Sequence, residues 1–587
     1  MCGIAGFMSN HGATPAAAML DALEAALVHR GPDGGGRFTA GGFAMVQRRL
    51  AIIDLKTGDQ PLFEPEGAAL VANAEIYDYI EQRVALDGAH FATKSDCEVP
   101  LHLYRRDGAR FAESLRGMYA MALYDPVPER LFLARDPFGI KPLYYLETAE
   151  GLAFASEPQA LFAAGLATPE LNTRSRDAFF QLQFTPGRDT IFEGVKRVLP
   201  GETLVVAKGR IVERLRRAAL PEGGPRPCGE ADAMAALDAA LEDSVMVHQR
   251  SDVPYGMFLS GGIDSAALLS MMARLNERPV RAFTVGFPDA GSGHDEREHA
   301  KAVARALGAE HVEVEFREAD FWSLLPAVAA ALDDPVADYA ALPTFKLAAA
   351  AASDLKVVLT GEGGDELFAG YGRYRSALKP WWRGGKAFRH RGVFDKLGIL
   401  REDPVGWRDE IAAAEVTEAR NGRSPLQVVQ AVDCVDWLPH DLLTKIDRCL
   451  MAHGIEGRTP LLDPAVVEAI FRLPDEMKIQ GSKGKWLLRR WLAERLPVAK
   501  PYSRKRGFRV PVAEWIAREG TRLAPLIAAQ PGVAEVCRQG VVEKLFINPR
   551  GRRRGFAAWL LLFYGLWHQR HVLGVTAGGD VFETLSE

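Results

Sequence analysis

The chain is 587 residues long, which exceeds what one hydrophobic core usually organises, so two or more domains are expected. Hydrophobic residues make up 48% of it and charged residues 25%, which is ordinary for a globular enzyme, and the formal net charge is -5. Because lysine and arginine are spread along the sequence, the charge does not indicate nucleic-acid binding, and chemistry on small molecules is expected instead.

Neither a membrane span nor a disulfide framework is predicted. No stretch approaches the roughly 18 uninterrupted apolar residues of a membrane helix, and the first residues lack the regions of a signal peptide, so a cytoplasmic location is expected. The cysteines are scattered and form no CxxC pair, which argues against disulfides and structural zinc. They are Cys2, Cys97, Cys228, Cys434, Cys449 and Cys537.

Short β-type runs separated by Gly, Pro and Asp dominate residues 1 to about 205 and predict a sheet-rich domain. The runs lie at 41–46, 49–55, 68–77, 119–125, 130–135 and 141–146, with helices predicted near 15–29 and 97–106. Segment 220–232 has three prolines and three glycines, the composition of a linker. We therefore expect a first domain at 1–210, a linker at 211–235 and a second domain at 236–587.

The second domain is predicted to be α/β. Strand-like runs at 255–260, 281–287 and 355–361 alternate with helical patterns, including an alanine-rich helix at 348–352, and this alternation predicts βαβ units and a parallel sheet. Beyond about residue 425 the chain is predicted to be largely helical.

Cys2 is a candidate nucleophile because removal of the initiator methionine would place its thiol beside a free α-amine. An α-amine has a pKa of about 7.7–8.0, so nucleophile and base could belong to one residue. The alternative is that position 2 simply tolerates cysteine.

Six ordered motifs weaken that alternative. They are MCGIAGF (1–7), HRGPDGGG (29–36), QRRLAIIDL (47–55), NAEIYDY (73–79), SDCE (95–98) and ARDPFGIKPLYY (134–145). Together they resemble the class II, N-terminal-nucleophile glutamine amidotransferases, and the resemblance implies an α+β sandwich of antiparallel sheets of the Ntn-hydrolase type.

Glutamine carries a carboxylate, an ammonium and the amide to be cut, so its site needs a cation, carboxylates and donors for an oxyanion. The resemblance places Arg49 on the carboxylate, Asp96 and Glu75 on the ammonium, and Asn73 with the N–H of Ala74 on the oxyanion. It also implies a glutamine-binding segment made of Leu50, Ala51, Ile52 and Ile53. The competing interpretation is that the charged residues are solvated at strand edges.

Two positions depart from the family pattern. Ala74 stands where the family usually has glycine, and a Cβ there would cost roughly 1 kcal/mol or more if the position requires a positive φ. Gln47 stands where related sequences often have histidine. Since Arg49 itself is retained, the second departure carries less weight.

The second domain opens with VPYGMFLSGGIDSAALL (253–269), which predicts a strand, a glycine turn and a helix. Backbone N–H groups at such a turn can bind phosphate oxygens. The turn resembles the pyrophosphate loop of the ATP pyrophosphatases, although an incidental strand-to-helix turn would look similar. A second glycine turn at 355–371 carries Glu362, Asp365 and Glu366, and oxygen ligands beside a phosphate loop suit Mg²⁺.

Three later motifs, at 442–463, 483–492 and 503–512, extend the resemblance to the synthetase half of the glutamine-hydrolysing asparagine synthetases. That resemblance covers residues 2 to about 515 and implies a doubly wound parallel sheet. It places Lys485 on the phosphates, Arg448 and Arg458 in the helical section, Glu362 at acyl-adenylate formation, and Asp264 and Asp365 on the metal. The implied ATP-binding residues are Leu259, Ser260, Gly261, Gly262, Asp264, Ser265, Val285, Thr360 and Gly361.

The resemblance implies that ATP is a co-substrate with Mg²⁺, that glutamine supplies ammonia, and that aspartate is amidated. The alternatives are amidation of another carboxylate, such as a peptide or surface-polymer precursor, a non-catalytic binding or regulatory relative, and a hydrolase that uses only the first domain. A homodimer agrees with the family, and neither nucleic acid nor membrane is expected as a partner.

Overall fold

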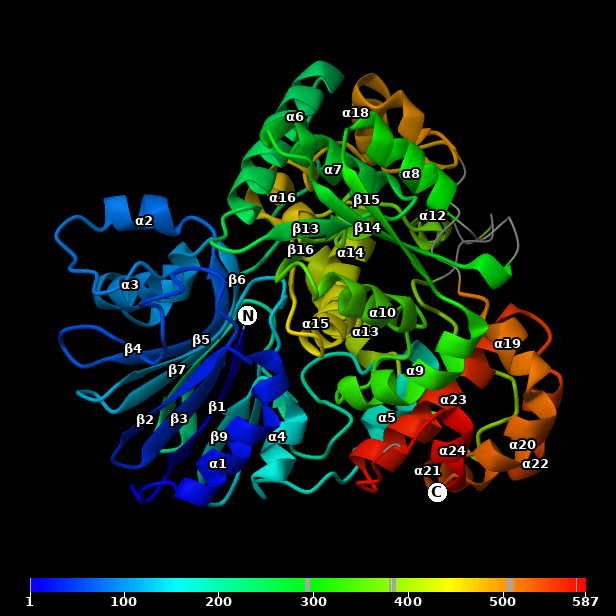
Figure 1. Ribbon diagram of the computed structural model, residues 1–587, viewed down its shortest axis with the longest axis horizontal. Coiled ribbons are helices and arrows are strands. Elements are labelled where there is room, and N and C mark those ends of the chain that lie inside the picture. The colour runs from blue at the N-terminus through cyan, green and yellow to red at the C-terminus, as the bar shows by residue number, and fades with distance from the viewer. Residues whose placement is uncertain (1, 291–295, 380–381, 383–386, 504–509, 577) are drawn as a thin grey trace.

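The computed structural model describes residues 2–290, 296–379, 382, 387–503, 510–576 and 578–587. The first part of the chain forms two six-stranded antiparallel sheets (Figure 1). The first sheet has the order β10 (Lys196–Arg197), β8 (Tyr144–Glu147), β9 (Gly151–Ala155), β1 (Cys2–Ser9), β3 (Phe43–Arg49) and β2 (Gly34–Ala40). The second has the order β12 (Arg210–Arg216), β11 (Glu202–Ala207), β7 (Arg130–Arg135), β6 (Gly117–Asp125), β5 (Ala69–Ile76) and β4 (Leu62–Phe63).

The two sheets pack face to face because alternate residues on their strands are apolar. Ile4, Met45, Val71 and Leu204 belong to the buried layer between the sheets. The outer faces pack on helices: α1 (Ala17–Ala26) and α4 (Pro158–Ala163) cover the first sheet, and α3 (Val99–Asp107) covers the second. The predicted α+β sandwich is thus confirmed, as are the helices predicted near 15–29 and 97–106.

One predicted β run is wrong. Residues 49–55 were expected to be extended, but β3 ends at Arg49 and the segment that follows is an irregular loop. The guanidinium of Arg49 donates to the carbonyls of Ile53 and Asp54, at 3.3 and 2.6 Å, and Asp54 has a φ of 53°. The chain therefore turns back around a buried cation, which local β propensity does not reveal.

The second part contains a five-stranded parallel sheet, as predicted. Its order is β15 (Glu310–Glu315), β14 (Arg281–Gly286), β13 (Tyr255–Phe258), β16 (Val357–Leu359) and β17 (Glu456–Arg458). Sequence analysis found β13, β14 and β16 but missed the other two strands, which form the edges. β15 alternates charged with apolar residues and β17 is only three residues long, so both patterns are weak.

Helices cover both faces of this sheet, so it is doubly wound. One face packs on α6 (Glu230–His248), α7 (Ile263–Leu275) and α8 (Arg297–Ala306), and the other on α9 (Glu318–Ala331), α10 (Ala341–Ala351) and α15 (Leu443–Met451). The strand order changes direction between β13 and β16. In such sheets, ligands bind at the carboxyl ends of the strands where the order reverses.

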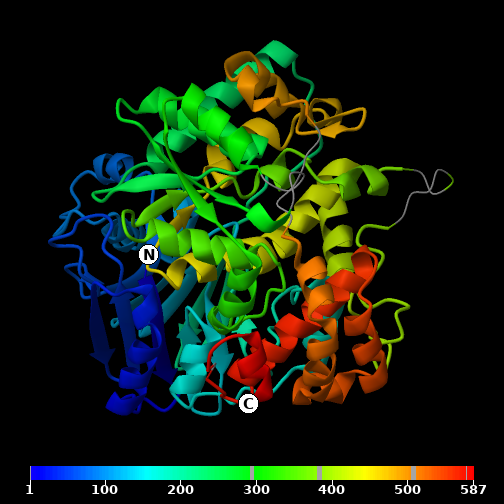
Figure 2. The same ribbon diagram turned by 45° about the vertical axis from the view of Figure 1, so that its right-hand side comes forward.

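The chain beyond residue 425 is mainly helical, as expected. It includes α14 (Pro425–Val432), a ten-residue π-helix η6 (Asp433–Leu442) that continues into α15, and the long helix α23 (Arg552–His571). Figure 2 shows the last helices grouped at one end of the molecule. No helix among the described residues is long and apolar enough to cross a membrane.

Helix α23 is buried along most of its length and holds a segment of the synthetase half. The indole N–H of Trp559 donates to the carbonyl of Ala337 at 2.8 Å, and that of Trp567 donates to the carbonyl of Asp333 at 3.2 Å. The last seventy residues, in which sequence analysis found no motif, thus support the 333–337 segment.

We expect Trp559→Phe to lower the midpoint of thermal unfolding, because the buried carbonyl of Ala337 would lose its donor at a cost of about 1–3 kcal/mol. Trp322→Phe is the matched control, since Trp322 is half-buried and its indole has no hydrogen bond among the described residues. Equal midpoints for the two variants would contradict the role given to the Trp559 hydrogen bond.

Candidate active sites

Strand alternation gathers the candidate glutaminase residues on one face. Residues of even number on β1, and of odd number on β3 and β5, point into the layer between the two sheets. Cys2, Arg49, Asn73 and Glu75 follow these parities, and each lies at or near the end of its strand. The four side chains therefore meet at one end of the sandwich, where the apolar layer stops.

Cys2 is held close to its proposed oxyanion donor. It is 6% exposed and pairs with Arg49 in the β1–β3 register. Its backbone N–H donates to Asn73 Oδ1 at 3.0 Å, whereas the buried Nδ2 of Asn73 has no partner within the described residues. A buried donor without a partner is costly, and a developing oxyanion would satisfy it.

The carboxylate-binding residue proposed from sequence is already engaged. Arg49 Nη1 donates to Asp59 at 2.7 Å, and the side chain of Asp59 is 83% exposed. Because an exposed carboxylate is free to move into water, the α-carboxylate of glutamine could take its place on Arg49. The loop that follows Arg49 contains Leu50, Ala51, Ile52 and Ile53, the remaining residues of the predicted glutamine site.

Glu75 and Asp96 are deeply buried carboxyls. Burial raises the pKa of both, and for Glu75 the nearby Arg458 opposes this rise. Arg458 Nη2 lies 3.0 Å from Glu75 Oε1, and Asp96 Oδ2 accepts from the N–H of Ile76 at 2.8 Å. The prediction that Arg458 lies in a helical section is wrong, because Arg458 belongs to strand β17 of the parallel sheet. A residue of the parallel-sheet domain thus reaches the candidate glutamine site.

The alanine that replaces the family glycine has an ordinary backbone. Ala74 lies within β5, is paired with Tyr119 on β6, and is not among the non-glycine residues with positive φ. The condition under which Ala74 would be strained is therefore not met. Gln47, the other departure, is buried on β3, and its side-chain amide has no partner among the described residues.

The two glycine turns meet at the point where the strand order reverses. One follows β13 and the other follows β16, and these strands are neighbours. A Cβ on Gly361 would lie 3.1 Å from the Cβ of Asp264, and one on Gly364 would lie 2.6 Å from Asp264 Oδ1. Only residues without a side chain let the two loops approach this closely.

The first turn already binds an anionic oxygen of the protein itself. The N–H of Gly261 donates to Glu296 Oε2 at 3.0 Å, and the N–H of Gly262 donates to Ser260 Oγ at 3.2 Å. Ser265 Oγ lies 3.0 Å from the carbonyl of Ser260 and braces the turn. Among the other predicted ATP-binding residues, Leu259, Val285 and Thr360 are buried at the carboxyl ends of β13, β14 and β16.

Lys485 joins the two turns. Its Nζ lies 2.5 Å from Asp264 Oδ2 and 2.7 Å from Asp365 Oδ1, and the two carboxylates raise its pKa although burial opposes the charge. Lys485 has a φ of 56° immediately before α18 (Trp486–Arg495), a conformation that few non-glycine residues adopt. Both carboxylates thus reach a single cation.

No group of three or more histidine, cysteine or acidic side chains is arranged to hold a metal ion among the described residues. Two carboxylates still suit Mg²⁺, which usually takes its remaining ligands from substrate phosphates and water. Asp264 Oδ1 is buried without a hydrogen-bond partner, so it can accept a further cation.

The other two acids of the second turn differ. The side chain of Glu362 is 24% exposed and lies 3.8 Å from the ammonium of Lys445. Glu366 is buried, accepts from the hydroxyl of Tyr371 at 2.7 Å, and burial together with Asp365 raises its pKa to about 8. Glu366 therefore stabilises the turn through its contact with Tyr371, whereas the side chain of Glu362 is partly exposed to solvent.

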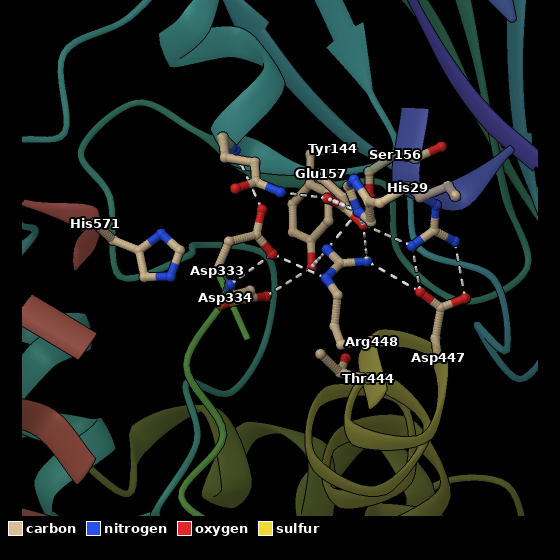
Figure 3. A network of polar contacts seen from close by, with 12 residues as sticks. His29, Tyr144, Ser156, Glu157, Asp333, Asp334, Thr444, Asp447, Arg448 and His571 are labelled. Carbon is tan, nitrogen blue, oxygen red and sulfur yellow. Dashed lines mark hydrogen bonds and ion pairs between the residues drawn. The ribbon is translucent and has the colours of Figure 1, made fainter. Parts of the chain in front are cut away.

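A buried ion network connects the nucleophile strand to helix α15. Arg30 Nε donates to the carbonyl of Cys2 at 3.2 Å, and its terminal nitrogens donate to Asp447 at 2.7 and 3.0 Å. The next residue, Arg448, contacts Asp447 and donates to Asp333 at 2.9 Å. Figure 3 shows Arg448 between these two acids, beside Tyr144 and Glu157 of the sandwich.

Sequence analysis did not assign roles to Arg30, Asp447, Lys445 or Glu157. Arg30 and Asp447 lie inside recognised motifs, yet a motif does not say which of its residues pair across a domain interface. The motif at 503–512 lies mostly outside the described residues, because 504–509 are not described.

The arrangement combines an amidotransferase sandwich that carries a candidate nucleophile with a parallel-sheet domain that carries a phosphate turn. The fold and site thus define a glutamine amidotransferase with a ligase domain. Residues 1–215 match the model of the glutamine amidotransferase domain, and residues 236–569 match that of asparagine synthase. The chain belongs to the asparagine synthetase family, whose members use ATP, and the resemblance found in the sequence is confirmed.

Curated relatives agree over nearly the whole chain. A Mycobacterium tuberculosis protein provisionally named a glutamine-hydrolysing asparagine synthetase is 35% identical over 97% of both chains. The Bacillus subtilis glutamine-hydrolysing asparagine synthetase 1 is 32% identical over the same shares. A Gibberella zeae protein named amidase chry2 is 34% identical over 82% of this chain and 84% of its own.

We expect Asp447→Asn to lower the unfolding midpoint and slow glutamine hydrolysis. Removing one charge of a buried pair costs about 3–5 kcal/mol, and Arg30 would lose the partner that orients it toward Cys2. Glu113→Gln is the control, because its ion pair with Arg110 is exposed and should contribute little. An unchanged midpoint and glutaminase rate in Asp447→Asn would show that the network does not stabilise the interface.

We expect Ala74→Gly to change the rate of glutamine hydrolysis by less than about 3-fold, because Ala74 is unstrained. The variant should also lose about 0.5–1 kcal/mol of stability, because glycine within a strand loses more conformational freedom on folding than alanine. Ala72→Gly is the control for the stability effect, because Ala72 lies two residues earlier on the same face of β5. A rise of about 10-fold in glutaminase activity, seen in Ala74→Gly alone, would mean that the methyl group obstructs the oxyanion.

Proposed function

We propose that the protein is a glutamine-dependent asparagine synthetase, with a glutaminase domain at 1–210, a linker at 211–235 and a synthetase domain at 236–587. The observation that carries the proposal is the position of Arg458. Its side chain contacts Glu75 at 3.0 Å, and its backbone carbonyl accepts from the N–H of Thr360 at 2.8 Å. One fully buried residue thus touches both the candidate glutamine site and the candidate ATP site.

In the glutaminase reaction, the thiolate of Cys2 attacks the side-chain amide of glutamine. Once the preceding residue is removed, the α-amine of Cys2 lies against Asn73 Oδ1, and it can take the thiol proton and pass it to the leaving ammonia. Asn73 Nδ2 stabilises the oxyanion, Arg49 binds the carboxylate, and Glu75 with Asp96 binds the ammonium. Water then hydrolyses the γ-glutamyl thioester to glutamate.

In the synthetase reaction, ATP activates the acceptor carboxylate, because its oxygen is a poor leaving group whereas AMP is a good one. The carboxylate of aspartate attacks the α-phosphorus, pyrophosphate leaves, and ammonia then displaces AMP to form asparagine. Lys485 and the turn at 260–265 bind the phosphates, and Glu362 supports formation of the acyl-AMP. Mg²⁺ held by Asp264 and Asp365 would neutralise phosphate charge.

The two reactions need a shared, water-poor path, because most free ammonia is protonated at neutral pH and then is no nucleophile. The buried contacts of Arg30 and Arg458 across the interface favour such an arrangement. A cytoplasmic location and a homodimer complete the proposal.

Pyrophosphate release with Mg-ATP and glutamine, measured with and without aspartate, tests the proposal, with asparagine followed by mass spectrometry. We expect aspartate-dependent pyrophosphate matched by asparagine. Cys2→Ala should abolish product formed from glutamine but not from ammonia, whereas Cys228→Ala, which changes an exposed thiol, should have no effect.

Glutamine hydrolysis without a response to aspartate would refute asparagine synthesis and would favour the amidation of another carboxylate. Activity on neither substrate would favour a non-catalytic relative.

A further inference from the structure

A buried cluster of charged and polar groups surrounds Glu362, and its other members have no role in the reactions described above. We call Asp338, Glu362, Asp441, Lys445 and Gln183 the acceptor cluster. Lys445 Nζ lies 2.9 Å from Asp338 Oδ2 and 3.8 Å from Glu362 Oε1, and Gln183 Nε2 donates to Asp441 Oδ2 at 2.6 Å. Two carboxylates therefore contact one ammonium, and the third, Asp441, is bound by an amide.

The fold brings the cluster together from distant parts of the chain. Asp441 and Lys445 are four residues apart where η6 continues into α15, so they lie on one helical face. Gln183 follows α5 (Thr173–Leu182) and has a φ of 72°, and its carbonyl accepts from the N–H of Ala337 at 2.9 Å. That bond fixes Gln183 next to the segment that carries Asp338. π-Helical segments such as η6 occur often at functional sites.

The cluster has an open end and a closed end. The side chains of Glu362 and Asp338 are 24% and 15% exposed, and Glu362 lies on the glycine turn of the candidate ATP site. Asp441 is fully buried at the other end, and its Oδ1 has no hydrogen-bond partner among the described residues. A buried acceptor without a donor carries a desolvation cost that a bound ligand could remove.

The electrostatics favour a cationic ligand. Burial, and next the charge of Asp338, raise the pKa of Asp441 well above its usual range. Lys445 lowers it, but this ammonium is already shared with Asp338 and Glu362. A second cation with several N–H donors would allow both aspartates to stay ionised and would satisfy Asp441 Oδ1.

We infer that the acceptor cluster binds the α-ammonium group of an amino-acid acceptor, with Asp441 as the residue that selects for that group. This inference rests on the proposed function, because it places the acceptor carboxylate at Glu362. The spare N–H donors of Lys445 would face the carboxylates of the same molecule. A carboxylic acid without the ammonium would leave Asp441 unpaired and would be a poor substrate.

The test compares pairs of acids that differ only in the ammonium group. Pyrophosphate release is measured with Mg-ATP and ammonium chloride, which bypasses the glutaminase, using aspartate against succinate and glutamate against glutarate. We expect the wild type to prefer one amino acid over its partner by about 100-fold or more in kcat/KM. Asp441→Asn should reduce that preference at least about 10-fold, because it should lower kcat/KM for the amino acid and leave kcat/KM for the acid without the ammonium unchanged.

Asp436→Asn is the matched control. Asp436 lies on the same π-helix, is similarly buried, and accepts from the N–H of Gly187 at 3.0 Å outside the cluster. This variant should keep the wild-type preference. The rate of glutamine hydrolysis should be unchanged in both variants, and this verifies that they fold. If Asp441→Asn does not fold, Asp338→Asn takes its place in the same assay.

The outcomes separate the inference from the proposed function. Wild-type activity on aspartate with an undiminished preference in Asp441→Asn would overturn the inference and leave asparagine synthesis intact. Activity on glutamate alone, with the preference lost in Asp441→Asn, would support the inference and refute asparagine synthesis. Release with succinate or glutarate as readily as with the amino acids would overturn the inference alone, and release with none of the four acids would overturn both.

Discussion

The structure depends on charged side chains that are buried between its two halves. Arg30, Arg448 and Arg458 are almost completely inaccessible, and each has at least one carboxylate partner across or along the interface. Such ions are stable in a low-dielectric interior only while all partners stay in place. The interface is therefore sensitive to small shifts, and Cys2 and the two glycine turns are held at a defined separation.

Helix α15 is the element through which most of these constraints pass. Within four residues it presents Lys445 to the acids beside Glu362, Asp447 to Arg30, and Arg448 to Asp333. A movement of this helix would alter the surroundings of both sites together. The π-helix η6 before it adds Asp441 to the same face, so one continuous helical run carries members of the acceptor cluster and also contacts the strand of the candidate nucleophile through Arg30.

Sequence reasoning succeeded where the information is local. Both glycine turns and the alternation of strands with helices follow from the types and spacing of neighbouring residues. It failed at 49–55, where a β-rich pattern forms a loop around Arg49, and at β15 and β17, whose patterns are short or highly charged. The metal residues predicted from the sequence, Asp264 and Asp365, stay a prediction, and the third acid of the turn, Glu366, accepts from the hydroxyl of Tyr371.

The sequence by itself determined the family and the order of the two halves, because ordered motifs encode these properties. Only the tertiary structure decided which charged and polar side chains contact each other. Arg458 and Glu75 are far apart in sequence, as are Gln183 and Asp441, and neither residue of either pair carries a local signal for its partner. Such pairings arise when the sandwich packs on the parallel-sheet domain and water is excluded, which makes an unpaired charge costly.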